Sequence, residues 1–157
     1  MRSTRKSLLA QSARFVVESL EQRTMLANVL SHQWLVDTAP QRLVVTFDTN
    51  MSNTLTANKI DLDNATTDTS ISGAVVSFST NGLTATVTWP NATNSTAPNV
   101  GGVLPEGNYR FVLSKANLPS LAADDVFDFF FKPADANGDR TVDDADYTRL
   151  NLSLIHI

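Results

Sequence analysis

Cysteine is absent from the 157 residues, and long apolar runs are absent as well. Without cysteine the chain can form neither a disulfide framework nor a thiolate metal site. No apolar run approaches the roughly 18 residues that a membrane-spanning helix needs, so we expect no transmembrane segment. Lys and Glu are scarce, whereas Thr, Asn, Ser and Asp are abundant. This composition favours strands and turns over helices.

Charge is distributed unevenly along the chain, whose formal net charge is −4. Residues 1–24 carry five basic groups against two glutamates, whereas residues 124–146 carry eight aspartates against Lys132 and Arg140. The middle of the chain lacks the clustered Lys and Arg that contact phosphates, so we expect no nucleic-acid partner. The acidic end indicates a cation as the partner instead.

Residues 1–28 have the basic start of an export signal. Gln11, Ser12 and Arg14 interrupt the apolar stretch, so the segment lacks a regular signal core. We expect an export or targeting segment that is disordered or helical. Within it, ESLEQRTMLA at 18–27 resembles the LE-x-R-x-L-L-type motif near the start of many large extracellular proteins of planctomycete bacteria. The resemblance implies an extracellular or cell-surface location.

Residues 29–132 are expected to form a β-sandwich, because short apolar runs alternate with clusters of turn residues. The expected strands recur at roughly 8–12-residue intervals; they are 30–36, 42–48, 58–63, 72–79, 83–89, 108–114 and 126–131. Alternation places two sets of side chains in the core: Leu43, Val45 and Phe47, and Tyr109, Phe111 and Leu113. The long loop at 89–107 is rich in Pro, Gly and Asn and cannot be a central strand.

One hairpin can be predicted down to its register. In AVVSFSTNGLTATVTW, a type I′ turn at Asn81-Gly82 places three pairs opposite each other: Phe78 with Ala85, Val76 with Val87, and Ala74 with Trp89. Val76, Phe78, Val87 and Trp89 then share the buried face, and the threonines of TATVT share the other face. Burial of each large side chain should contribute about 1.5–3 kcal/mol.

The segments APQRLVVTFDTNMS, SFSTNGLTATVTW, LPEGNYRFVLS and DDVFDFFF together resemble bacterial immunoglobulin-like modules of surface proteins. The resemblance covers residues 39–131. It implies an immunoglobulin-like β-sandwich.

The stretch ADANGDRTVDDAD at 134–146 has the spacing of a twelve-residue calcium loop. Oxygen donors fill positions one, three, five, seven, nine and twelve of this loop, which supply the ligands that Ca²⁺ prefers; they are Asp135, Asn137, Asp139, Thr141 through its carbonyl, Asp143 and Asp146. Val142, at the eighth position, is expected to anchor the loop to a core. The alternative is a solvated acidic tail.

Two positions depart from the general EF-hand pattern. Arg140 occupies the sixth position, where glycine is usual, and Asp146 at the twelfth has a shorter side chain than glutamate. Both should weaken Ca²⁺ binding, to roughly the 10⁻⁴–10⁻³ M range of extracellular modules. Without the ion, repulsion between the carboxylates should leave the loop disordered.

D-x-N-x-D-x-x-V-D-x-x-D followed by YTRL also resembles one repeat of a type I dockerin. That resemblance implies the same six ligands, a helix starting near Tyr147, and a cohesin-like partner. We assign residues 133–151 to an incomplete repeat of this kind. The last six residues, LSLIHI at 152–157, resemble the translation of a transposase end used in sequencing libraries, and we expect them to be adapter-derived.

No motif of a catalytic site is present. His32 and His156 have no placed nucleophile, and Asp61 and Asp63 fit a solvated strand surface. The sequence therefore predicts a non-catalytic secreted or cell-surface fragment that docks to another surface protein through a Ca²⁺-dependent loop. Two alternatives remain: the accessory C-terminal region of a polysaccharide-degrading enzyme, with polysaccharide as a partner, or a structural adhesin or matrix module.

Overall fold

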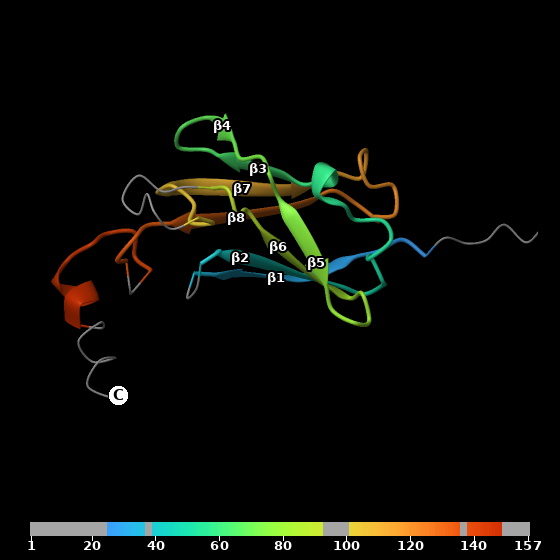
Figure 1. The fold of residues 1–157 in the computed structure, drawn as a ribbon, viewed down its shortest axis with the longest axis horizontal. Coiled ribbons are helices and arrows are strands. Elements are labelled where there is room, and N and C mark those ends of the chain that lie inside the picture. The colour runs from blue at the N-terminus through green and yellow to red at the C-terminus, as the bar shows by residue number, and fades with distance from the viewer. Residues whose placement is uncertain (1–24, 37–38, 93–100, 136–137, 149–157) are drawn as a thin grey trace, which may run out of the picture.

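The described residues fold around two facing antiparallel β-sheets (Figure 1). The computed structural model describes residues 25–36, 39–92, 101–135 and 138–148. Most of the expected export segment and the whole of 152–157 lie outside these residues. The prediction of a mostly β protein is confirmed, and none of the described helices is long and apolar enough to cross a membrane.

Eight strands are described, and seven of them correspond to the expected ones. They are β1 (Val29–Leu35), β2 (Arg42–Phe47), β3 (Asp61–Asn64), β4 (Thr69–Ser70), β5 (Val75–Phe78), β6 (Thr84–Thr88), β7 (Gly107–Leu113) and β8 (Asp125–Phe131). The strand expected at 58–63 starts later, because η1 (Ala57–Lys59) forms a 3-10 turn first. The two-residue strand β4 was not predicted, since it is too short to show alternation.

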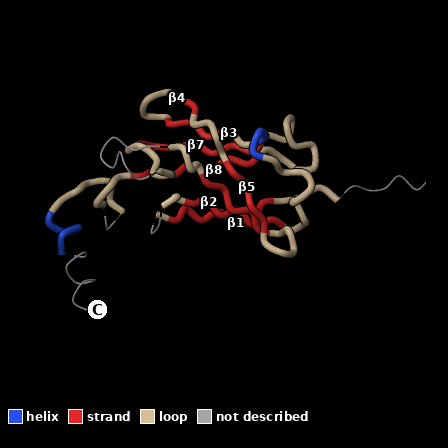
Figure 2. The backbone as a smooth tube through the Cα atoms, in the orientation of Figure 1, coloured by secondary structure: helices blue, strands red, loops and turns tan. Residues whose placement is uncertain are grey.

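The strands are arranged in the orders β1-β2-β6-β5 and β4-β3-β7-β8. Strands β1 and β8 form the edges on one side of the two layers, and β5 and β4 form the edges on the other. The acidic segment follows the end of β8, and its helical residues 144–148 lie beyond the end of the sheets (Figure 2). The loop is therefore attached to the sandwich through a single edge strand.

The hairpin of β5 and β6 has the predicted register. Val76 pairs with Val87 and Phe78 pairs with Ala85, although the ladder ends at Val75 and Thr88, one pair before the expected Ala74–Trp89 pair. The predicted type I′ turn is wrong, because only Gly82 of the two turn residues has a positive φ, of 70°.

The side chain of Asn81 stabilises this turn instead. Its Oδ1 accepts hydrogen bonds from the Ser79 hydroxyl at 2.7 Å and from the Leu83 N–H at 3.1 Å. The side chain of Asn81 therefore holds the loop together, and the backbone of Asn81 has a negative φ. The register is the predicted one although the turn type differs, because the alternating buried and exposed faces of the two strands determine the register.

The core lies between the two sheets. Both predicted sets of core side chains are buried: Leu43, Val45 and Phe47 from β2, and Tyr109, Phe111 and Leu113 from β7. Trp89, which directly follows β6, is buried with them, and Val76 and Phe78 pack partly buried against the core. Each of these strands buries every second side chain, which is the reason that alternation in the sequence predicted them.

Side chains from β1 and β8 join the two edge strands across the sandwich. His32 Nε2 lies 2.7 Å from Asp125 Oδ2, and its ring stacks on Phe127 with centroids 4.6 Å apart. Trp34 packs on Phe129 with the rings tilted by 34° and their centroids 4.5 Å apart. Of the two histidines, His32 therefore connects the two sheets, and His156 lies outside the described residues.

Tyr109, near the start of β7, connects its strand to the preceding loop. Its buried hydroxyl donates a hydrogen bond to the carbonyl of Pro105, four residues upstream, and accepts one from Asn64 Nδ2 at 3.3 Å. Burial raises the pKa of the Tyr109 hydroxyl to about 12, against the smaller opposing effect of the Asn64 hydrogen bond. The phenol is thus held in its neutral, donating form.

Candidate calcium loop

The first half of the acidic segment is folded around the carboxylate of Asp135. One oxygen accepts the N–H of Gly138 at 2.7 Å, and the other accepts the N–H of Arg140 at 2.8 Å. These donors are at positions four and six of the expected loop. Asp135 therefore has two roles in the sequence pattern: it is the first expected ligand and it closes the turn on which the others depend.

Arg140 has the backbone conformation that explains the usual glycine at the sixth position. Its φ is +72°, in the left-handed region that side chains disfavour, and Gly138 two places earlier has a φ of +78°. A left-handed conformation costs a non-glycine residue about 1–2 kcal/mol. The predicted departure at position six is thus accommodated by backbone strain, not by a different path of the chain.

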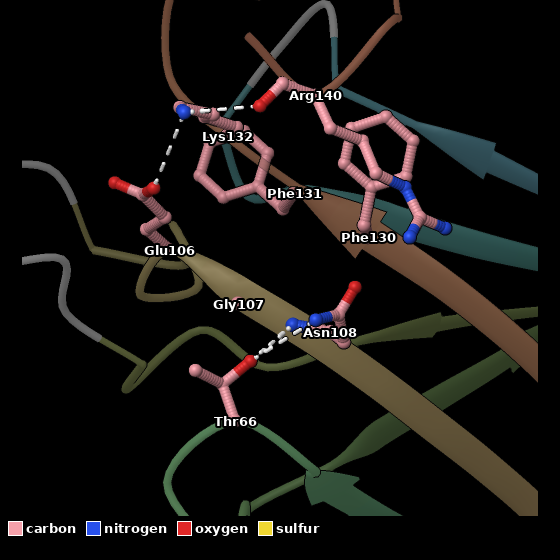
Figure 3. Close-up of a pocket in the computed structure, with 8 residues that line it drawn as sticks. All are labelled: Thr66, Glu106, Gly107, Asn108, Phe130, Phe131, Lys132 and Arg140. Atoms are coloured by element: carbon pink, nitrogen blue, oxygen red, sulfur yellow. Dashed lines mark hydrogen bonds and ion pairs between the residues drawn. The ribbon is translucent and has the colours of Figure 1, made fainter.

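The side chain of Arg140 contacts the sandwich (Figure 3). Its guanidinium carbon lies 4.8 Å from the centre of the Phe130 ring, on the outer face of β8. The Nζ of Lys132 donates a hydrogen bond to the Arg140 carbonyl at 3.0 Å and lies 3.9 Å from Glu106 Oε1. Together with Thr66 and Asn108, these groups line an open pocket of about 360 Å³.

The second half of the segment begins a helix. Asp143 Oδ1 accepts the N–H of Ala145 at 2.8 Å, and Asp146 Oδ2 accepts the N–H of Asp143 at 2.9 Å. Asp143 thus acts as the N-cap of the helix, and Asp146 bonds back to the Asp143 N–H as the third helical residue of a capping box does; both carboxylates satisfy amides that the helix itself leaves unpaired. Residues 144–148 are helical, so the described helix begins at Asp144, three residues before the expected start near Tyr147.

The six expected ligands are distributed over these two halves. Asp135 is half-buried, Asp146 is only 1% exposed, and the other described members, Asp139, Thr141 and Asp143, are exposed; Asn137 lies outside the described residues. Asp139 Oδ1 accepts the N–H of Thr141 at 2.8 Å. Within 25–36, 39–92, 101–135 and 138–148, no three Asp, Glu or His side chains lie close enough to share one metal ion.

The donor set nevertheless fits Ca²⁺ by its chemistry. The described part of the loop holds carboxylates at four of the expected ligand positions, from Asp135, Asp139, Asp143 and Asp146, and carboxylates are hard oxygen ligands. In the present arrangement these carboxylates accept backbone N–H groups of the same loop. An ion would therefore have to draw the carboxylates together without breaking the turn.

The expected role of Val142 is wrong. Its side chain is 43% exposed, so it does not anchor the loop to a core. The nearby sandwich instead presents the ring of Phe130 to Arg140. The contact that attaches the loop to the rest of the protein is thus made two positions earlier.

Three features of this region were not predicted from the sequence: the capping role of Asp143 and Asp146, the position of Phe130, and the contact of Phe130 with Arg140. The spacing of Asp143 and Asp146 is that of a capping box and could have been recognised as such. Phe130 could have been placed on the outer face of β8 from the alternation of Phe129 and Phe131 toward the core. Its contact with Arg140 had no signal in the sequence, because the two residues are brought together by the turn at Pro133 and Ala134.

Two other acidic residues, Asp61 and Asp63, belong to β3, where a solvated surface was expected. Asp61 is exposed, and Asp63 accepts a hydrogen bond from the Ser70 hydroxyl at 2.6 Å.

Comparison with known proteins adds no further information on the site: no protein-family model, no curated protein and no solved structure matches this chain.

Proposed function

We propose that this chain is a non-catalytic, secreted or cell-surface module that binds Ca²⁺ through residues 135–146 and uses the ordered loop for protein docking or surface assembly. The observation that carries the proposal is the turn around Asp135. Its carboxylate accepts the amides at positions four and six, and Arg140 adopts the left-handed conformation of the sixth residue. A solvated acidic tail would have no reason to adopt this conformation.

The ion would be held by six oxygen donors, namely Asp135, Asn137, Asp139, the carbonyl of Thr141, Asp143 and Asp146. Ca²⁺ would supply positive charge at the centre of a loop whose carboxylates otherwise repel one another. Asp143 and Asp146 already stabilise the start of the helix at residues 144–148, in which the loop ends. Tyr147 on that helix is 69% exposed and would contribute to a surface for a cohesin-like partner.

The strand order supports an immunoglobulin-like assignment of residues 29–132. Sheets ordered β1-β2-β6-β5 and β3-β7-β8 have the ABED and CFG arrangement of such sandwiches, with β4 as an additional edge strand. The Tyr109 hydroxyl bonded to the Pro105 carbonyl corresponds to the tyrosine corner of the same fold. We infer a spacer role for this domain, which presents the loop at its end.

The proposal predicts that Asp135→Asn weakens Ca²⁺ binding roughly tenfold or more, because affinity in such loops follows the number of ligand charges. Asp144→Asn removes the same charge at the tenth position, which is not a ligand in the pattern, and should change affinity little. Isothermal titration calorimetry of Ca²⁺ into the full 157-residue chain measures both. Amide NMR shifts of residues 138–148 should move on saturation.

Equal affinities for the two variants would show that the loop attracts Ca²⁺ only through its net charge. Absence of heat and of amide shifts with the unsubstituted chain would rule out the site altogether. Titration with Mg²⁺ is the control for selectivity, since Mg²⁺ prefers a smaller, octahedral set of ligands.

A further inference from the structure

Arg140 is at once the sixth residue of the candidate loop and its contact with the sandwich. Its guanidinium lies 4.8 Å from the centre of the Phe130 ring, and its carbonyl accepts a hydrogen bond from Lys132. Phe130 lies near the end of β8, and Lys132 directly follows that strand. The loop therefore contacts the sandwich at a residue whose left-handed backbone conformation is part of the turn around Asp135.

Phe130 is placed for this contact by the alternation of β8. Phe127, Phe129 and Phe131 pack against the core, so the side chain of Phe130 is on the opposite, outer face. An aromatic ring on the outer face of a sheet attracts a guanidinium through its negative π-face. No ion-pair partner of the Arg140 side chain is found among residues 25–36, 39–92, 101–135 and 138–148, so the ring is its main described contact.

We propose that the outer face of β8 at Phe130 is the docking surface for the loop, and that the contact couples Ca²⁺ binding to the stability of the sandwich. The inference rests on the proposed Ca²⁺ site. Its physical basis is linkage: if the docked loop has the backbone conformation at Arg140 that binds the ion, docking favours binding, and binding must favour docking by the same factor. Arg140 acts as a positioning residue and not as a ligand.

The experiment measures Ca²⁺ affinity by calorimetry, and thermal unfolding of the sandwich by the fluorescence of Trp34 and Trp89, with Ca²⁺ and with chelator. Phe130→Ala and Arg140→Ala should each weaken Ca²⁺ binding about two- to fivefold, which is the range of an exposed cation–π contact. In both variants the rise in Tm on adding Ca²⁺ should shrink. Combining the two substitutions should add little, because they remove the same contact.

Two further variants separate docking from other effects. Phe130→Leu keeps an apolar side chain on the strand but removes the aromatic ring, and should lose the coupling as Phe130→Ala does. Val126→Ala changes another outward side chain of β8, 53% exposed, and should leave affinity and the Ca²⁺-induced rise in Tm unchanged. Arg140→Gly should bind Ca²⁺ roughly fivefold or more tightly than Arg140→Ala, because glycine adopts a positive φ without the cost.

Wild-type affinity and a wild-type rise in Tm in the Phe130 variants would overturn the coupling and leave the Ca²⁺ site intact. Absence of Ca²⁺ binding in the unsubstituted chain would overturn both the site and the coupling. Loss of affinity in Val126→Ala equal to that in Phe130→Ala would also overturn it, since the effect would then come from the strand and not from the ring.

Discussion

Gly102→Ala is expected to destabilise the sandwich by about 2–5 kcal/mol, against about 1–2 kcal/mol for Gly73→Ala. Both glycines have a φ near +80°, so both substitutions incur the left-handed cost of a side chain. They differ in the space around the new methyl group. An added Cβ at Gly102 would lie 2.3 Å from Pro40 Cβ and 2.6 Å from Pro40 Cα, whereas at Gly73 the nearest atom is Asn91 Nδ2 at 3.9 Å.

The backbone at Gly102 has little freedom to avoid the clash. Its N–H donates to the Ala92 carbonyl and its carbonyl accepts from the Gln41 N–H, each at 2.8 Å. The buried side chain of Gln41 accepts the N–H of Leu104 at 2.9 Å and fixes the next residues as well. Urea unfolding followed by tryptophan fluorescence compares the two variants, and equal losses of stability would show that the loop moves aside at Gly102.

Alkaline pH is expected to remove about 2–3 kcal/mol of stability through Tyr109 alone, which follows from a folded pKa of about 12 against an ordinary value of 10.0. The pKa is raised in the folded state because burial disfavours the phenolate. The contribution is therefore complete below pH 10 and is lost as the pH rises from 10 through 12. Above that range the phenol is ionised in both the folded and the unfolded protein, and this contribution to stability is absent.

Tyr109→Phe tests this contribution, because it removes the titrating group together with its hydrogen bonds. The variant should be less stable than the wild type by about 1–3 kcal/mol at neutral pH, since the Pro105 carbonyl and the Asn64 amide lose their partner. Its deficit should shrink between pH 10 and 12. Tyr147→Phe is the matched control, because Tyr147 is 69% exposed and its substitution should not alter the pH profile.

Urea unfolding at pH steps from 9 to 12 gives the difference between each variant and the wild type. Lysines titrate in the same range, but they do so in all three proteins and cancel in that difference. A constant deficit of Tyr109→Phe across the range would mean that the phenol is not buried in its neutral form.

Alternation of apolar and polar side chains determined most of the sandwich in advance. Leu43, Val45 and Phe47 are buried as predicted, because a strand with one face on a core must place every second residue there. The hairpin register of Val76 with Val87 followed from the same constraint. The turn type did not follow, since the hydrogen bond that Asn81 Oδ1 accepts from the Leu83 N–H competes with the backbone geometry that Asn-Gly usually indicates.

The candidate loop divides in the same way. The sequence alone predicts the order of oxygen donors from Asp135 to Asp146, because the position of a residue in a tight loop decides whether its side chain can reach a shared ion. It does not predict the contact that fixes the loop. Val142 was expected to anchor it, whereas Arg140 does so by lying over Phe130.

The sequence by itself thus determined the strands, their faces and the spacing of the acidic residues, since each depends on neighbours within a few positions along the chain. Only the tertiary structure decided which partners lie across the sandwich and beside the loop. His32 with Asp125, Tyr109 with Asn64, and Arg140 with Phe130 join different elements of the chain. Such contacts depend on how the sheets pack and where the chain turns. The pattern of neighbouring residues in the sequence does not predict either.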